Sequence, residues 1–495
     1  MKKLLSVFLS VCILLTCVPV ACFAAPDKST VQPVPRSAEN YPVIVIRGVS
    51  LDGLYTNYGT PEQTSAVKPI TTGDILSTAL KAVGSGIVHL NFDSAVDEII
   101  GYAGDVFGKL ACNKDGTPVY NIGLPRYPLN VDNYKNELIT GGGTGAEEGI
   151  VKSAADHYGA SDVYYFTYDW RLNPLDICDE INDMVNLALA EHHTGKVNIV
   201  SCSMGGVETV AYFSKYGYEK VNKCVFLSST FYGTYIVSDL FCGKVTTSGL
   251  TLYNFLADKT EGNVFLSFTV KALYKTGVLS LVSVLADKFI EKYKDKIYDG
   301  FLRDTFGTMP VWWGLVQPED YNQALNYMFG GREKEYAGII AISKDLQKLM
   351  AGRESLLKDA AAGGVEFAVV ANYNSPPMPI YERACANSDG GLETVLVSGG
   401  GTVADYGKTL GSNYVASNKI YVSPDNVIDA STCIFPNSTW FVKNGEHVAC
   451  NYGSQYSDFL FWMLGCNGQP TVFSSAKYPQ FLISGSGQTI ASLVQ

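Results

Sequence analysis

Short apolar runs and helix-type patterns alternate through the first half of the chain. The apolar runs are rich in Val, Ile, Tyr and Phe and end in small or polar residues, as buried strands do. The segments 175–192 and 204–216, which lie between such runs, repeat their apolar residues at the spacing of a helix. This alternation predicts an α/β fold with a mostly parallel, doubly wound sheet and helices on both faces. The runs that we assign to strands are 41–48, 162–170, 196–203 and 221–228.

The alternation stops after Ser229. From 243 to 364 the pattern is mainly helical and rich in Leu, Val, Phe, Tyr and Trp, and a strand-like run returns at 365–372. An insertion between core strands, placed over the strand tips, is where such folds carry a lid. We therefore expect a core made of 41–242 and 365–495, interrupted by a helical lid insertion over 243–364.

The N-terminus has the pattern of a secretory signal peptide. Lys2 and Lys3 precede an apolar run over 4–20, and small residues follow it. We expect cleavage after Ala24, so that 1–24 are removed, 25–40 form a tether, and the protein is secreted or held at the cell surface. No later run reaches the roughly 18 apolar residues of a membrane span, so we expect none in the mature chain.

The balance of charges excludes several classes of function. The chain holds 48 Asp and Glu against 37 Lys and Arg, and its formal net charge is −11. An acidic chain without a basic cluster is not expected to bind nucleic acid. The His and Cys residues lack the spacing of a metal site, and the glycines of 141–149 fit neither a dinucleotide nor a phosphate loop. We therefore expect no metal and no cofactor.

The segment 197–206 carries the main candidate for chemistry. It reads Val-Asn-Ile-Val-Ser-Cys-Ser-Met-Gly-Gly, a strand that runs into Ser203 and is followed by two glycines and a helix. This is the pattern of a nucleophile elbow, in which small neighbours leave room for a strained turn that exposes the serine hydroxyl. Ser201 stands where the usual pattern has its first glycine. We take Ser203 as the candidate nucleophile.

One histidine has the right place in the chain to serve this serine. A hydrolase triad of this type runs in the order serine, acid, histidine, and of the five histidines only His447 follows Ser203. An acid that orients the imidazole should lie just beyond a strand end. Asp425 is favoured because it follows the strand-like segment 419–422. The acids that we weigh are Asp389, Asp425 and Asp429, the last of which also suits a turn cap.

Two backbone donors are expected to receive the oxyanion. The N–H of Met204 lies at the start of the helix that follows the elbow, where N–H groups lack helical partners. The second donor is expected from Val49, which follows the glycine at the end of the first predicted strand.

A further motif, Tyr168-Asp169-Trp170-Arg171, lies upstream of the elbow. Together with the Ser-Met-Gly-Gly elbow it resembles the lecithin:cholesterol acyltransferase-like family of α/β-hydrolases. That family also has an Asp-Gly-x-Val stretch before a late histidine, which we match to Asp-Asn-Val-Ile at 425–428. The resemblance covers the chain from about 41 to 464, and it implies an α/β-hydrolase fold and acyl-ester chemistry on lipids.

Three tryptophans are candidates for binding the acyl chain. Trp312 and Trp313 lie in the predicted lid, and Trp170 belongs to the Tyr-Asp-Trp-Arg motif. For each of them, simple packing in the lid or core is the alternative. Asp169 and Arg171 are expected to form an ion pair that supports the strand end rather than to act in catalysis.

These observations predict a secreted serine hydrolase of lipase or phospholipase type, which forms an acyl-enzyme and needs no cofactor. Its partners would be a lipid or other ester substrate and, transiently, a lipid interface. An O-acyltransferase that moves a fatty acyl group to an alcohol or sterol is one alternative, because it uses the same acyl-enzyme. A surface binding protein on a degenerate hydrolase fold is another, since Arg47, Ser201 and Asn426 depart from the usual pattern.

Overall fold

The computed structural model describes residues 41–50, 53–68, 93–140, 148–260, 264–445, 447, 454–485 and 489–494. The expected signal peptide (1–24) and tether (25–40) lie outside these ranges.

An eight-stranded sheet forms the centre of the molecule, in the order β13-β12-β11-β8-β7-β6-β1-β5. Neighbouring strands run parallel, except that β13 pairs antiparallel with β12 at one edge. The predicted α/β fold with a mostly parallel sheet is therefore confirmed. The strands are β1 (Val43–Ile46), β5 (Val163–Phe166), β6 (Val197–Cys202), β7 (Val221–Leu227), β8 (Glu366–Tyr373), β11 (Thr439–Lys443), β12 (Phe481–Ser484) and β13 (Ile490–Ser492).

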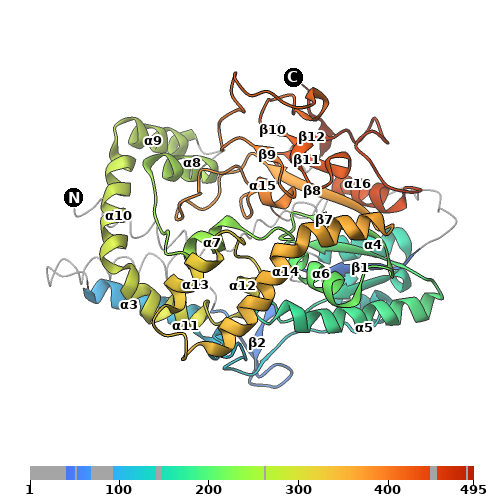
Figure 1. Cartoon of the computed structure of the whole chain (residues 1–495), viewed down its shortest axis with the longest axis horizontal. Coiled ribbons are helices and arrows are strands. Elements are labelled where there is room, and N and C mark those ends of the chain that lie inside the picture. The colour runs from blue at the N-terminus through green and yellow to red at the C-terminus, as the bar shows by residue number, and fades with distance from the viewer. Residues whose placement is uncertain are drawn as a thin grey trace.

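Helices cover both faces of this sheet, as the alternating pattern predicts (Figure 1). Successive side chains of a strand point to opposite faces, and in β1 Ile44 and Ile46 join one apolar cluster while Val43 and Val45 join the other. The first cluster packs against α5 (Pro174–His192), α6 (Gly205–Tyr216) and α14 (Ala337–Ala362). The second packs against α4 (Glu148–Tyr158) and α16 (Ser454–Gly465).

A large helical region lies between β7 and β8 in the chain, and in Figure 1 most of its helices gather beside the sheet. It begins at Tyr235, eight residues before the expected start of the insertion, and ends at Ala362. Before α14 it contains α7 (Tyr235–Phe241), α8 (Gly249–Lys259), α9 (Val264–Lys275), α10 (Val278–Ile297), α11 (Arg303–Thr305), α12 (Pro310–Trp313) and α13 (Tyr321–Phe329). We call residues 235–362 the cap.

Short elements complete the fold. The helix α3 (Asp93–Phe107) lies against the cap near α10, and the one-turn helix α15 (Thr394–Val397) packs on β8. Two small antiparallel sheets lie outside the main one. They are made of β2 (Tyr55–Thr56), β3 (Thr64–Ser65) and β4 (Ile122–Gly123), and of β9 (Thr402–Val403) and β10 (Ile428–Asp429).

Candidate active site

Ser203 forms the turn between β6 and α6, and its backbone is strained. Its φ of 47° lies in the left-handed region, which residues other than glycine rarely adopt. The turn after β7 holds this conformation, because the carbonyl of Ser203 accepts hydrogen bonds from the Thr230 N–H (2.8 Å) and the Ser229 hydroxyl (3.2 Å). The Ser203 N–H donates to the Leu227 carbonyl at 3.2 Å. The side chain that results is partly exposed, as the elbow pattern predicts.

The small residues around the elbow are required by close backbone contacts. A β-carbon on Gly205 would lie 2.9 Å from the Ile46 carbonyl oxygen, and one on Gly206 would lie 2.5 Å from the Phe231 nitrogen. Ser201, which replaces the usual glycine, is accommodated because its side chain is fully buried and accepts a hydrogen bond from Thr209 at 3.1 Å. The departure at Ser201 therefore leaves the elbow intact.

His447 joins this serine to a carboxylate. Its Nε2 lies 3.0 Å from Ser203 Oγ, and its Nδ1 lies 2.9 Å from Asp389 Oδ2. The Asp389 carboxylate is fully buried, whereas 16% of the His447 side chain is exposed. The structure thus brings together serine, imidazole and carboxylate in the arrangement of a hydrolase triad.

The loop after Asp389 fixes the carboxylate in place. Asp389 Oδ1 accepts hydrogen bonds from the N–H groups of Gly391 (2.9 Å) and Leu392 (2.7 Å), which leaves Oδ2 for the imidazole. The backbone of His447 is tied to the same loop, because its N–H donates to the Asp389 carbonyl at 2.8 Å. Gly391 lies so close to the ring that a β-carbon there would be 2.9 Å from it. Both ends of the Asp389–His447 contact are therefore set by backbone geometry.

The pairing that the sequence favoured, between Asp425 and His447, is wrong. The Asp425 carboxylate binds the Tyr373 hydroxyl (2.9 Å), the Ser423 hydroxyl (2.7 Å) and the Lys443 ammonium group (2.9 Å). Burial on its own would raise the pKa of Asp425, but these hydrogen bonds outweigh it and hold the pKa below its ordinary value. Asp425 thus ties the ends of β8 and β11 together beside the site.

The choice of Asp425 was wrong because the segment before it is not a strand of the main sheet. The apparent strand before Asp425 is a 3-10 turn over Lys419–Tyr421 outside the main sheet, so Asp425 does not follow a strand of that sheet. Asp429, the second alternative, accepts hydrogen bonds from the Ser431 N–H and the Tyr414 hydroxyl. A signal for Asp389 was present: residues 389–390 read Asp-Gly, the first two residues of the family's Asp-Gly-x-Val stretch.

The loop that follows β1 lies next to the elbow and contains Val49. In the sheet Ile46 is paired with Ser201, so the chain leaves β1 beside the end of β6. The Tyr168 hydroxyl donates to the Arg47 carbonyl at 3.1 Å, and Trp170 Nε1–H donates to the Ser50 carbonyl at 3.2 Å. Tyr168 and Trp170, the first and third residues of the Tyr-Asp-Trp-Arg motif, thus bind the two ends of the segment 47–50. Sequence reasoning did not predict this role.

The remaining residues of that motif pair with each other. Arg171 Nη2 lies 2.6 Å from Asp169 Oδ2, and both side chains are buried. Arg171 also donates to the Leu110 carbonyl at 3.0 Å. The geometry is the ion pair expected at the strand end.

Met204, the first expected oxyanion donor, is the N-cap of α6, where a backbone N–H has no partner within the helix.

The three candidate tryptophans do not line one shared surface. Trp170 and Trp312 meet edge to face with ring centroids 5.8 Å apart, so the cap contacts the motif here. Trp313 is fully buried in the cap, where it packs against Phe241 and Phe329. Packing, the alternative that the sequence left open, accounts for Trp313.

Comparison of the sequence with protein-family models and with curated proteins gives no match to either.

Within the ranges that the structure describes, no group of three His, Cys, Asp or Glu residues is placed to hold a metal ion. Over the same ranges no single helix meets the length and hydropathy criteria of a membrane span. The bent pair Leu266–Lys275 and Val278–Thr305, at 70°, meets them only when its two helices are taken together.

Proposed function

We propose that this protein is a serine hydrolase of the α/β-hydrolase type, which cleaves carboxylic esters with Ser203, His447 and Asp389. The observation that carries the proposal is the chain of two hydrogen bonds from a strained, partly exposed serine to a buried carboxylate. A carboxylate in this position holds the imidazole in one tautomer and stabilises the imidazolium that forms during the reaction.

The reaction follows from the positions of these atoms. His447 Nε2 takes the proton of Ser203 Oγ as the oxygen attacks the ester carbonyl carbon. The negative charge that develops on the carbonyl oxygen is received by the backbone N–H of Met204 and, from the loop after β1, that of Val49. His447 then gives the proton to the departing alcohol, and the acyl group stays on Ser203. In the second half of the reaction His447 Nε2 takes a proton from water, which attacks the acyl carbonyl carbon. His447 then returns the proton to Ser203 Oγ as the carboxylic acid leaves.

A lipid ester is the substrate class that we favour. The Tyr-Asp-Trp-Arg and Ser-Met-Gly-Gly motifs resemble the lecithin:cholesterol acyltransferase-like family, whose members act on lipids. Among the side chains that the structure describes on α9 and α10, four large apolar ones are exposed, and such exposure is typical of surfaces that meet apolar partners. They are Leu266, Phe268, Leu281 and Val284, of which Phe268 is 71% exposed. The N-terminal pattern supports secretion.

The decisive experiment is covalent labelling of the folded protein by a fluorophosphonate. We expect stoichiometric labelling, together with turnover of soluble short-chain esters, and loss of both in Ser203→Ala. Ser214→Ala, an exposed serine of α6, is the matched control and should behave as the wild type. If the folded wild type is neither labelled nor active on any ester, the proposal is overturned and a binding protein remains.

Product analysis separates hydrolysis from transfer. The purified protein is given a phospholipid or long-chain ester, with and without an added alcohol or sterol. Release of free fatty acid in both conditions supports hydrolysis. Formation of a new ester at the expense of the free acid identifies an acyltransferase, which uses the same acyl-enzyme.

A further inference from the structure

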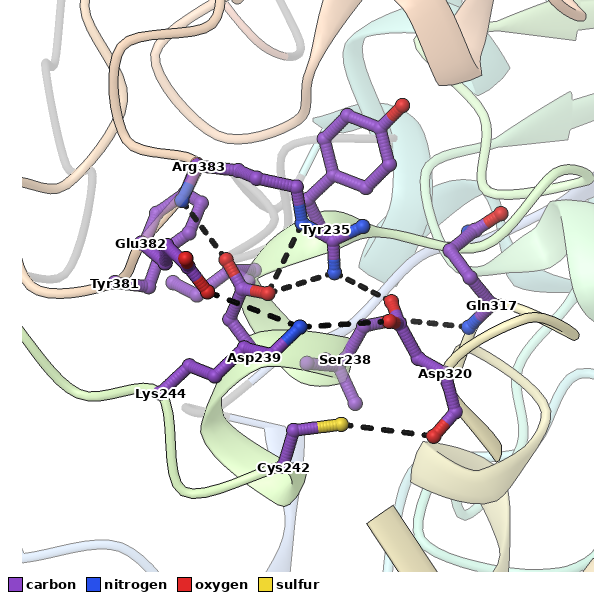
Figure 2. Close-up of polar contacts among 12 residues, drawn as sticks. Tyr235, Ser238, Asp239, Cys242, Lys244, Gln317, Asp320, Tyr381, Glu382 and Arg383 are labelled. Carbon is purple, nitrogen blue, oxygen red and sulfur yellow. Dashed lines mark hydrogen bonds and ion pairs between the residues drawn. The ribbon is translucent and has the colours of Figure 1, made fainter. Parts of the chain in front are cut away.

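The segment 374–393, which we call the strap, leaves the end of β8 and carries Asp389 near its end. It is fastened to the cap in two places. The first is Arg383, whose guanidinium lies between Asp239 of α7 and Asp320 at the start of α13 (Figure 2). Its Nη2 lies 2.7 Å from Asp239 and 2.5 Å from Asp320. The Asp239 side chain is fully buried, so this contact joins the strap to the interior of the cap.

The second fastening is Glu393, which lies four residues after Asp389. Its carboxylate accepts hydrogen bonds from the N–H groups of Tyr235 (3.1 Å) and Ile236 (3.1 Å) at the start of α7. It also accepts one from the hydroxyl of Tyr381 in the strap, at 2.7 Å. Glu393 is 1% exposed. A buried carboxylate with three donors therefore links the cap, the middle of the strap and the loop of the triad acid.

Glu393 is rigidly connected to Asp389 through the backbone. Ser388 and Glu393 form an antiparallel bridge, and between them the Asp389 N–H donates to the Leu392 carbonyl at 3.1 Å. Leu392, the neighbour of Glu393, also donates its N–H to the Asp389 carboxylate. These contacts connect the position of Glu393 to that of the carboxylate that contacts His447.

We propose that Glu393 is a positioning residue. It sets the orientation of the Asp389 carboxylate toward His447, and it makes that orientation depend on the position of α7. This inference rests on the proposed function only for its kinetic consequence. The Glu393 carboxylate can accept all three hydrogen bonds, whereas a glutamine in its place would turn an NH2 group toward one of the N–H donors. Because catalytic geometry tolerates little displacement, a shift of about 1 Å can lower a rate roughly 100-fold.

The test compares Glu393→Gln with Glu382→Gln, the same substitution at an acid of the strap whose side chain is 59% exposed. Rates are normalised to the fraction of protein that reacts with the fluorophosphonate. We expect Glu393→Gln to lower kcat on a soluble ester about 10- to 100-fold, with KM changed by less than about twofold, and Glu382→Gln to match the wild type. Tyr381→Phe, which removes only one of the three donors, should lower kcat by less and in the same direction.

A double-mutant cycle with Asp389→Asn separates positioning from general damage. If Glu393 acts through Asp389, the double variant is no slower than Asp389→Asn alone. If the two losses multiply, or if kcat per reactive site is unchanged in Glu393→Gln, the inference is overturned.

A measurement without substrate keeps this inference distinct from the proposed function. The proton on His447 Nδ1, hydrogen-bonded to a carboxylate, is followed by NMR of protein with ¹⁵N-labelled histidine. Its resonance is assigned by its loss in His447→Ala. We expect it to move or broaden in Glu393→Gln and to stay in place in Glu382→Gln. That result upholds the positioning role even if the wild type proves inactive, and an unmoved resonance overturns it even if the wild type is a hydrolase.

Discussion

His447 Nδ1 lies 2.9 Å from Asp389 Oδ2, and the backbone N–H of His447 donates to the carbonyl of the same aspartate. The side chain and the main chain of the two residues are therefore joined at once. Asp389 is fully buried and its other carboxylate oxygen accepts hydrogen bonds from two N–H groups, so that Oδ2 is the oxygen that faces the imidazole. With Nδ1 on Asp389, the opposite ring nitrogen Nε2 lies 3.0 Å from Ser203 Oγ.

The two aspartates on which sequence and geometry differ can be told apart by kinetics. We expect Asp389→Asn to lower kcat on esters about 10⁴-fold, because an amide cannot hold the imidazole in the required tautomer. Asp425→Asn should change kcat by less than about tenfold. It should also lower the free energy of unfolding by roughly 1–3 kcal/mol, since Lys443 would lose its charged hydrogen-bond partner. Steady-state rates and urea unfolding of both variants provide the measurement, and the reverse ranking of kcat would restore Asp425 as the acid.

The hydrogen bond from Trp170 Nε1–H to the Ser50 carbonyl holds the loop that carries Val49 in place. Trp170→Phe keeps most of the ring but removes the hydrogen bond to the Ser50 carbonyl. We therefore expect kcat to fall about 10-fold, because a displaced loop weakens an oxyanion donor. Trp313→Phe is the matched control, since it also removes an indole hydrogen bond, to the Gly307 carbonyl, but deep in the cap. It should lower stability and leave kcat within about twofold. Equal kcat losses in the two variants would argue against a special role of Trp170.

Glu208 of α6 makes the stability of the protein depend on pH. It is fully buried, neither carboxylate oxygen has a hydrogen-bond partner within the described part of the chain, and burial raises its pKa well above the ordinary value. The folded state therefore binds a proton that the unfolded state gives up. This contribution to stability is fully present below the ordinary pKa of 4.5 and is lost as the pH rises from there through the raised pKa of the folded state.

Replacing that carboxyl group should remove the effect. We expect Glu208→Gln to increase the free energy of unfolding at pH 8 by roughly 1–3 kcal/mol and to change it little at pH 4.5. Glu219→Gln, at an exposed position, should be neutral at both values. Urea unfolding at the two pH values is the measurement, and an equal gain at both would show that the titration of Glu208 is not the cause.

The exposed apolar residues of the cap are expected to matter only at a lipid surface. Phe268→Ser should lower the rate on a long-chain ester in vesicles several-fold, because less apolar area can leave water on contact. On a soluble short-chain ester it should react at the wild-type rate. Phe473→Ser, at another exposed phenylalanine (63%) outside the cap, serves as the control. A loss on both substrates would instead indicate a damaged fold.

Five strands of the central sheet (β1, β5, β6, β7 and β8) and its elbow were predictable from local patterns, whereas β11, β12 and β13 were not assigned from the sequence. Buried parallel strands are continuous apolar runs, and those ending near Gly48, Ser203 and Ser228 form β1, β6 and β7. The elbow was readable because its strained turn requires small neighbours in the sequence itself, and Ser203 indeed has a positive φ. The place of His447 followed from chain order alone, since no other histidine comes after the serine.

The acid was not predictable in the same way, because its choice depends on contacts between distant segments. Asp389 and Asp425 both stand in polar loops before His447, and only the folded chain shows that Asp389 contacts the imidazole while Asp425 contacts Lys443. Likewise, the pairing of Tyr168 with the Arg47 carbonyl joins residues far apart in the chain. Sequence patterns therefore determined five strands of the sheet (β1, β5, β6, β7 and β8), the serine and the histidine, for which backbone geometry and chain order suffice. The tertiary structure decided which carboxylate completes the set, because loop positions depend on long-range hydrogen bonds that leave no periodic trace in the sequence.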